Sequence, residues 1–403
     1  MFRTNSPGST GAGYYTNGNP ATGVPATVVD APWLNMVQDE LENVLVAAGI
    51  TPNEANSAQL LASIQAIVGL VPGNRNAFIN SDFAIQQRNK TSTQGLGAGN
   101  NVNGAYQCDR WLQLHDAPAG TGQASIGRGT FALGQTAVPG EPRFFLHHQQ
   151  TVGSNVSAPR FLQRIENVRA WAGKTATLQV WLKGLTSFSA TARVTQNFGT
   201  GGAPSTAVVC GSAVFAVTTT WTLFTVTVTL PSIAGKTLGT AGNDHLLVEI
   251  ELPAAATFTI DAARPQFEAG SLASAYESRT EAEELALCLR YYEKSYPLNV
   301  DPGTISAPGA ARGFCYTSQA TGAKCFSSLL TRFNVEKRAT PAMTWYSPSS
   351  STAGFVETIV PGTTSTVSST SEISRTNTGF PITPNGNATN ENFAAHWTAD
   401  AEL

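Results

Sequence analysis

The stretch Trp221-Thr-Leu-Phe-Thr-Val-Thr-Val-Thr-Leu230 alternates threonine with bulky apolar residues along most of its length. Successive side chains of a β-strand point to opposite faces, so this pattern predicts a strand with one buried face and one face in water. Thr177–Lys183 and Leu246–Leu252 alternate in the same way and are bounded by Gly, Pro or Ser turns. Short alternating strands between turns predict a mainly β fold.

Composition sets wider limits. The chain has 403 residues, 37 of them Gly, and only 13% are charged, which suits two or three domains of short strands and tight turns. A net charge of −3 without a Lys/Arg cluster argues against nucleic-acid binding. No apolar run is long enough to span a membrane, and Met1–Asn5 does not lead into the apolar core of a signal peptide. We expect neither a nucleic-acid partner nor membrane insertion.

The cysteines are odd in number and widely spaced, and no two of them lie two residues apart as in a zinc site. We expect reduced, mostly buried thiols in a protein made in a cytoplasm, and neither a metal nor a cofactor. Only one pair could meet, across a hairpin: Cys315 and Cys325. The five are Cys108, Cys210, Cys288, Cys315 and Cys325.

An extended Gly/Pro/Thr arm, Gly18–Asp30, leads into an amphipathic helix. Asp30 can cap the first amides, Pro32 falls in the first turn, where its missing N–H costs nothing, and Gly49 ends the helix. Apolar residues recur at spacings of three and four and form a stripe along one side. The stripe consists of Trp33, Val37, Leu41, Val44, Leu45 and Ala48.

A second helix is predicted over Ser57–Val68, capped by Asn56 and closed by Gly69 and Pro72. Two helices of this length cannot bury their stripes by themselves. Either they form a helical hairpin that packs on its own domain, or they pack against symmetry copies in a fibre. The second stripe consists of Leu60, Leu61, Ile64, Ile67 and Val68.

The arm and first helix resemble the attachment end of bacteriophage tail fibre proteins. Two predicted strands, Asn74–Arg88 and Tyr106–Trp111, resemble the start of the jelly-roll, carbohydrate-binding-module-like domain of many phage tail and fibre proteins. Phe258–Ser271, with Ala275–Glu277 after it, resembles the closing strand of that domain. The resemblance implies a jelly-roll β-sandwich over about half of the chain.

The helical stretch Thr280–Tyr292 resembles the linker that introduces the distal domain of phage fibres. Lys337–Tyr346 and Phe393–Leu403 are similar to the tail-fibre tip family, in which a small β domain trimerises, and strands joined by exposed loops are expected over Ser347–Asn377. The predicted domains are a helical attachment and trimerisation segment (1–72), the jelly roll (73–278), the linking helix (279–296) and a trimeric β tip (297–403).

Several residues could carry binding chemistry. Trp111, Trp171, Trp181 and Trp221 could stack on sugar rings, although aromatics on alternating strands more often belong to a core. Asp109 and Arg110 could grip a polar ligand or form a structural salt bridge. His147 and His148 should point to opposite faces of a strand, which disfavours a shared metal.

The sequence offers no catalytic constellation. Gly173-Lys-Thr175 and Gly235-Lys-Thr237 imitate the end of a phosphate-binding loop, but the glycine required five positions earlier is Val168 or Leu230. Two carboxylates across a cleft would suggest glycoside hydrolysis, but the acidic cluster lies near a helix start, where a solvated face is expected. That cluster is Glu281, Glu283 and Glu284. We therefore expect no enzyme.

The resemblance implies a virion protein made in the host cytoplasm: a homotrimeric tail fibre. Its N-terminus would dock on tail or baseplate proteins through Trp33, Val37, Leu41, Val44 and Leu45, which would also line the trimer interface. Its distal domain would touch a host surface glycan or protein receptor. The alternative is a polysaccharide-degrading tailspike, which normally shows the repeats of a long β-helix, and none is visible.

Aromatic side chains are natural receptor contacts because their flat faces pack on sugar rings. In the tip the candidates are Trp345, Tyr346 and Trp397. Trp345 and Tyr346 are neighbours on a predicted strand, so at most one of them should be exposed. Two alternatives stay open: all three belong to the core or trimer interface, or the polar loops between Ser347 and Asn377 make the contact.

Overall fold

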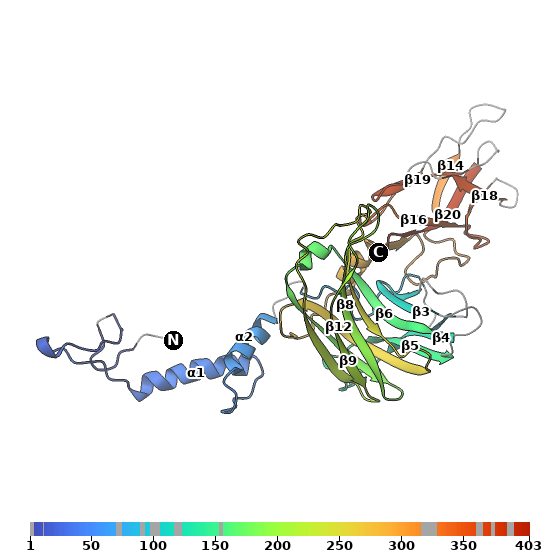
Figure 1. The fold of residues 1–403 in the computed structure, drawn as a ribbon. Coiled ribbons are helices and arrows are strands. Elements are labelled where there is room, and N and C mark those ends of the chain that lie inside the picture. The colour runs from blue at the N-terminus through green and yellow to red at the C-terminus, as the bar shows by residue number, and fades with distance from the viewer. Residues whose placement is uncertain are drawn as a thin grey trace. The chain divides into compact units, whose positions relative to one another are not determined.

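The computed structural model describes residues 4–10, 12–69, 75–88, 93–96, 105–116, 123–152, 156–315, 329–359, 366–371, 375–384 and 391–403 (Figure 1). The chain divides into two compact units. The N-terminal unit holds residues 1–74 and 274–277, and the C-terminal unit holds residues 75–273 and 278–403. The N-terminal unit contains η1 (Pro20–Thr22), α1 (Ala31–Ala47) and α2 (Gln59–Gly69).

The C-terminal unit contains a β-sandwich, a helix and a β tip. The sandwich elements are β1 (Thr93–Leu96), β2 (Ala105–Cys108), β3 (Trp111–Asp116), β4 (Gln123–Thr130), β5 (Phe144–Val152), β6 (Ser157–Glu166), η2 (Val168–Trp171), β7 (Thr175–Gly184), β8 (Phe188–Asn197), β9 (Val208–Val217), β10 (Thr222–Thr229), β11 (His245–Glu251) and β12 (Phe258–Ala269). The helix α3 (Glu281–Leu289) and the tip follow: β13 (Tyr292–Lys294), β14 (Ala311–Cys315), β15 (Leu329–Arg332), β16 (Ala342–Tyr346), β17 (Phe355–Ile359), β18 (Thr366–Ser371), β19 (Gly379–Pro384) and β20 (Glu391–Asp400).

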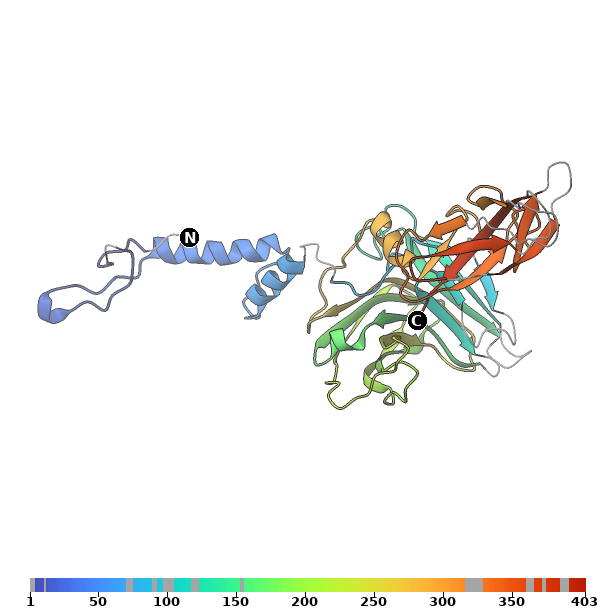
Figure 2. The same ribbon diagram turned by 90° about the horizontal axis from the view of Figure 1, so that it is seen from above.

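In the N-terminal unit, α1 begins and ends as predicted. The Asp30 side chain accepts a hydrogen bond from the Trp33 amide at 3.4 Å, and Gly49 follows the helix with φ +71°. The second helix begins later than predicted, because the Asn56 carboxamide accepts from the Ala58 amide and the Gln59 side chain bonds back to Asn53. These local bonds hold a turn where the helix was expected. Figure 2 shows α2 folded back beside the end of α1.

Much of the described apolar surface of these helices is exposed. Leu45 is buried and Trp33 packs edge-on against Tyr15, but Leu41 is 43% exposed and Leu61 is 59% exposed. Further exposed apolar side chains are Leu34, Val46, Leu60 and Ile64. Neither helix, nor any other helix among the described residues, is long and apolar enough to cross a membrane.

The sandwich consists of two antiparallel six-stranded sheets, as the jelly-roll prediction requires. The order in the first sheet is β1-β4-β5-β12-β7-β10, and in the second sheet β2-β3-β6-β11-β8-β9. The predicted strands around Thr177, Trp221, Leu246 and Phe258 are confirmed as β7, β10, β11 and β12.

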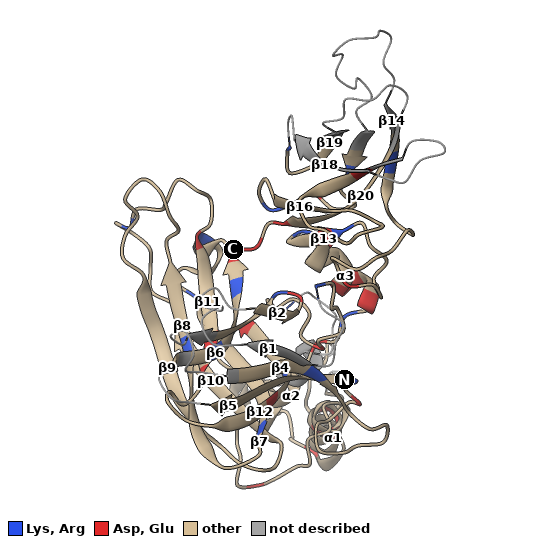
Figure 3. Ribbon diagram, turned by 90° about the vertical axis from the view of Figure 1, so that its right-hand side faces the viewer, with Lys and Arg blue, Asp and Glu red and all other residues tan. Residues whose placement is uncertain are grey.

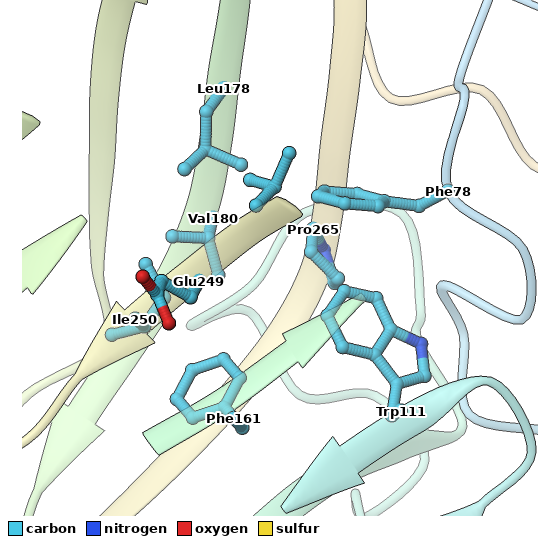
Figure 4. A pocket seen from close by; sticks show the side chains of 9 residues that line it. Phe78, Trp111, Phe161, Leu178, Val180, Glu249, Ile250 and Pro265 are labelled. Carbon is cyan, nitrogen blue, oxygen red and sulfur yellow. The ribbon is translucent and has the colours of Figure 1, made fainter. Parts of the chain in front are cut away.

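The inner faces of the two sheets form the main hydrophobic core. Figure 4 shows a void there beside Phe78, Trp111 and Phe161, and its volume is about 10 Å³. That volume is near the minimum for a single water molecule. The void is therefore too small for a ligand.

The prediction that Asn74–Arg88 is a strand is wrong, since residues 75–88 form turns and irregular chain. The side chains of two buried asparagines hydrogen-bond to backbone groups, where a strand would bond to the backbone of a neighbouring strand. The Asn76 Oδ1 accepts from the amides of Phe78 and Phe267. Asn80, at φ +60°, accepts from the Ile85 amide and donates to the carbonyls of Ile85 and Asp109. A short amide side chain tolerates this left-handed conformation and imitates backbone groups.

The predicted single strand Tyr106–Trp111 is also wrong, because the chain turns within it. β2 ends at Cys108, β3 begins at Trp111, and the two strands pair as a hairpin. Arg110 occupies the turn with φ +71°.

In the tip, β20 is the central strand and pairs with β13, β14, β16 and β17. The helix α3 ends at Leu289. The prediction that Tyr292 is helical is therefore wrong, because Tyr292 begins β13. The core of the tip packs Trp345 and Trp397 against Phe333 and Phe380.

Buried charges join the sandwich to the tip. Glu402 pairs with Arg88 at 3.1 Å and with Arg110, and only 8% of its side chain is exposed. Arg338 donates to the carbonyls of Ala401 and Glu402 and also to Gly242 of the sandwich. The last residues of β20 and the chain after it are thus held against the sandwich.

We expect Asn80→Ala to destabilise the sandwich by about 3 kcal/mol, because three buried backbone groups lose their partner and an αL position loses a residue that tolerates it. Urea unfolding followed by tryptophan fluorescence measures the loss. Asn56→Ala, in the exposed turn before α2, is the control and should leave the sandwich transition unchanged. An unaltered transition in Asn80→Ala would contradict the role given to this side chain.

We expect the tip to lose stability as the pH falls from about 7 to 5. His396 is fully buried between the Ser295 hydroxyl at 2.9 Å and the Ser306 carbonyl at 2.8 Å, and it stacks on Tyr296. Burial lowers the pKa of His396. Neutral His396 therefore contributes fully to the stability of the tip above the pKa of an unfolded histidine, about 6.5. That contribution is lost as the pH falls through the pKa of His396 in the folded protein.

Thermal unfolding across this pH range tests the expectation in the full chain and in His396→Gln. The variant should show a flatter pH dependence of the tip transition, since glutamine carries no titrating proton. His147→Gln, in the sandwich, is the matched control. Identical pH dependence in the native chain and His396→Gln would contradict the assignment.

Candidate functional site

The outward face of the first sheet carries an unusual set of side chains. Since Leu178, Val180 and Leu182 of β7 point into the core, their neighbours Gln179, Trp181 and Lys183 point outward. The same alternation turns residues of β5 and β12 to this side, and the registers align them as His147, Asp261 and Lys183. We call this surface the outward face and define it by Phe131, Phe145, His147, Trp181, Lys183, Trp221 and Asp261.

Three aromatic rings meet across the outward face. The ring centroids of Phe131 and Phe145 are 5.0 Å apart, and Trp221 lies 5.2 Å from Phe131 and 5.7 Å from Phe145. Two strands, β12 and β7, lie between β5 and β10. In a flat sheet the backbones of β5 and β10 would therefore be about 14 Å apart. The sheet therefore curls toward this side, and the chain at Trp221 leans over it.

Gly129 allows one of these rings its position. A Cβ at Gly129 would lie about 2.0 Å from the Phe145 ring, so the ring rests directly on the backbone of β4. Phe131, Phe145, Trp181 and Trp221 are all half-buried, and each keeps part of its surface in solvent. They form an apolar surface on which a flat apolar ligand face could pack.

Polar groups stand beside the rings. His147 Nδ1 lies 2.7 Å from Asp261 Oδ1, and both side chains are partly exposed. Lys183 is the register partner of Asp261, yet it makes no ion pair with any described residue. The outward face thus combines aromatic surface, an acceptor, an imidazole and an ammonium.

The other end of the first sheet is covered. The Thr177 hydroxyl donates to the Gly270 carbonyl, and the Thr227 hydroxyl donates to the Ser271 carbonyl. Gln266 and Glu268 are buried there and bond to each other at 2.9 Å. At this end the chain after β12 covers part of the outward side of the sheet, whereas Thr225 and Thr229 of β10 stay exposed.

Metal ligands and carboxylates are scarce on the described part of the outward face. Among the described residues, no group of His, Cys, Asp and Glu could hold a metal ion. On the described part of the outward face Asp261 is the one carboxylate that solvent reaches, since Glu268 is buried. Glycoside hydrolysis normally needs two carboxyl groups across the scissile bond.

The four tryptophans proposed as sugar contacts separate into two pairs. Trp181 and Trp221 lie on the outward face, whereas Trp111 is a core residue with 2% exposure and Trp171 packs on Phe267. Sequence reasoning missed Phe131 and Phe145. The alternation along Phe144–His148 could have predicted that Phe145 points outward. The contact of Trp221 with Phe131 could not have been predicted in this way, because it depends on the curvature of the sheet.

The pairing of Asp109 with Arg110 is wrong, although both residues are structural. Adjacent side chains across a tight turn diverge: Asp109 accepts from Gln87 and lies 3.6 Å from Arg88, while Arg110 pairs with Glu402. Burial raises the pKa of Asp109, an effect that Arg88 and Gln87 oppose. The prediction that the two histidines face opposite ways is confirmed, since His148 is buried against Phe258.

The acidic cluster at the start of α3 is only partly solvated. Glu283 completes a capping box with Thr280, as a helix start predicts. Glu284 corrects the expectation, because it is buried, pairs with Arg279 at 3.1 Å and accepts from the Asn80 amide. Burial raises the pKa of Glu284. It anchors α3 to the sandwich.

The burial of two of the three tip aromatics favours the alternative that they belong to the core. Trp345 and Trp397 are each 5% exposed and are register partners on β16 and β20, so they form the tip core and offer no face to a receptor. Tyr346 is half-buried and packs edge-on against Tyr296. On α1, Trp33, Val37 and Val44 are half-buried, and their predicted role with Leu41 and Leu45 in attachment and trimerisation stays a prediction.

The cysteines of the described chain fit the expectation of reduced thiols. Cys108 and Cys288 are buried and free, Cys210 is half-buried and free, and burial raises the pKa of all three. Cys325 lies outside the described residues, so the possible Cys315–Cys325 pair stays a prediction. Parts of Ser347–Asn377 also lie outside them.

No family model matches the chain. Over 93 residues it is 37% identical to the uncharacterized protein StfP of Escherichia coli K12, a match that spans 23% of this chain and 42% of that protein.

Several solved structures are similar. The N-terminal cellulose-binding domain of Cellulomonas fimi β-1,4-glucanase C is 14% identical, covers 46% of this chain and 94% of that one, and has a TM-score of 0.26. TmCBM61 in complex with β-1,4-galactotriose is 9% identical, with 49% and 100% coverage and a TM-score of 0.27. The enzymatically active domain of bacteriophage CBA120 tailspike protein 4 is 13% identical, with 48% and 21% coverage and a TM-score of 0.28. At these TM-scores, function has to be argued from the chain's own residues.

Proposed function

We propose that this protein is a non-enzymatic adhesin of a bacteriophage tail: a homotrimeric tail fibre that binds a host surface glycan through the outward face of its sandwich. The observation that carries the glycan-binding role is the half-exposed cluster of Phe131, Phe145 and Trp221, with Trp181 on the same face.

Sugar rings present apolar C–H faces and a rim of hydroxyl groups. The aromatic cluster supplies surface for the first, and Asp261, His147 and Lys183 supply acceptors and donors for the second. Tryptophan and phenylalanine have few rotatable bonds, so ordering them on binding costs little entropy. The curled sheet holds these groups in place before a ligand arrives.

Binding without hydrolysis is favoured because the outward face offers Asp261 but no second exposed carboxylate among its described residues. A depolymerising tailspike remains the competing function. Incubation of the purified protein with host polysaccharide, followed by chromatography of the soluble fraction, distinguishes the two. The adhesin should release no oligosaccharide, and a steady release would establish the enzyme.

The tail-fibre role is supported by the sequence resemblance of the N-terminal arm, the jelly roll and the tip. The exposed apolar residues on α1 and α2 support self-association, because isolated amphipathic helices gain stability by burying such stripes. Identical chains around a closed symmetry axis would bury them without any further sequence. The same segment would then present the extended arm to tail or baseplate proteins.

We expect Trp181→Ala and Trp221→Ala each to weaken adsorption to host cells by roughly tenfold, which corresponds to a loss of about 1.4 kcal/mol of binding free energy. The matched control is Trp171→Ala, which removes another half-buried indole at Phe267, away from the outward face. Binding is measured with fluorescent protein on intact cells, and circular dichroism confirms folding. Full binding by a folded double variant would contradict the proposal.

We expect Leu41→Asp combined with Leu61→Asp to dissociate the trimer, because buried carboxylates would replace leucines at the interface. Light scattering should give three times the chain mass of 42.3 kDa for the native protein and 42.3 kDa for the variant. Leu133→Asp, at a sandwich loop position that is 96% exposed, is the control and should stay trimeric. A native protein that is monomeric at micromolar concentration would refute the trimer.

A further inference from the structure

We infer that the glycan bound at the outward face is acidic, and that its carboxylate pairs with Lys183. This inference rests on the proposed glycan-binding function and names the class of sugar: a uronic acid or another sugar acid.

Lys183 has an anion beside it in the sheet but does not use it. Asp261 is its register partner on β12, and residues directly opposite on adjacent strands have Cβ atoms about 5 Å apart. Asp261 instead bonds to His147 on its other side, at 2.7 Å. The Asp261 side chain is 15% exposed and the Lys183 side chain is half-buried. The ammonium is thus left without a carboxylate among the described residues.

The indoles of the outward face flank this ammonium. Trp181 precedes Lys183 by two positions on β7 and therefore points to the same side. Trp221 immediately precedes Thr222, whose register partner is Leu182, so the chain at Trp221 runs beside Lys183. A sugar ring stacked on either indole would direct its ring substituents toward the ammonium.

Of the other two cations near the outward face, Arg128 is held by hydrogen bonds, whereas Arg143 is exposed and makes no ion pair with a described residue. Arg128 donates to the carbonyls of Phe83 and Ala84 and lies over the Phe144 ring, and Arg143 lies 4.7 Å from the centroid of the same ring. Glu268 is buried at the covered end of the sheet. In Figure 3 most of the sandwich ribbon is uncharged.

Charge complementarity selects the ligand. A neutral glycan lying over Lys183 would strip water from the ammonium without replacing its counter-charge, which costs free energy. A carboxylate would replace that water with a charge-assisted hydrogen bond, which is roughly twice as strong as a neutral one. Asp261 opposes the anion less than an unpaired carboxylate would, because its Oδ1 is already bonded to His147.

The test uses the full-length protein on a glycan array that holds matched pairs, each pair differing only in a carboxylate: a uronic acid against its neutral hexose, and a sialylated against an asialo glycan. Native protein should bind carboxylated members at least tenfold more tightly than their neutral partners. Lys183→Gln should abolish this preference, and Lys183→Arg should retain it. Lys236→Gln, at a sandwich lysine near Phe198, is the control and should behave as native.

Salt gives an independent readout. Binding by the native protein should weaken between 50 and 500 mM NaCl, roughly an order of magnitude in ionic strength, whereas the residual binding of Lys183→Gln should not. Equal binding of neutral and acidic members, or an unchanged preference in Lys183→Gln, would overturn the inference while leaving the glycan-binding function intact. Binding to no glycan on the array, together with no loss of host-cell adsorption in Trp181→Ala and Trp221→Ala, would refute both.

Discussion

The turn at Asp109 and Arg110 is the constraint on which the C-terminal unit depends. Asp109 holds the irregular chain before β2 through Gln87 and Arg88, and Arg110 holds the end of the tip through Glu402. Glu402 and both arginines are largely buried, so each ion would be costly without its partners. One short hairpin therefore ties the start of the sandwich to the end of the tip.

The outward face follows from the same sandwich. The inner face of the first sheet forms part of the core. Because side chains alternate along a strand, every second residue of β5, β7 and β12 points outward. The curl of the sheet then brings Trp221 to Phe131 and Phe145, which no short segment of sequence brings together. In the tip, by contrast, Trp345 and Trp397 are buried in the core of the tip itself.

Alternation and capping in the sequence were enough to predict the mainly β fold, the strands β7, β10 and β11, and both ends of α1. These features depend on local periodicity and on neighbouring side chains. The strand β12 was predicted from the family resemblance. The strand predicted at Asn74–Arg88 failed because Asn76 and Asn80 bond to backbone groups that are distant in sequence. The sequence did not predict the burial of Glu284 and did not decide between core and receptor contact for Trp345, since each depends on elements far along the chain.

We propose above all that a host glycan binds at the aromatic half of the outward face. A crystal structure of the full-length protein with an oligosaccharide prepared from the host surface tests it most directly. The account predicts a sugar ring in contact with Trp181 or Trp221, with a polar substituent within hydrogen-bonding distance of Asp261 or Lys183. An oligosaccharide bound at the tip, with the outward face empty, would contradict it.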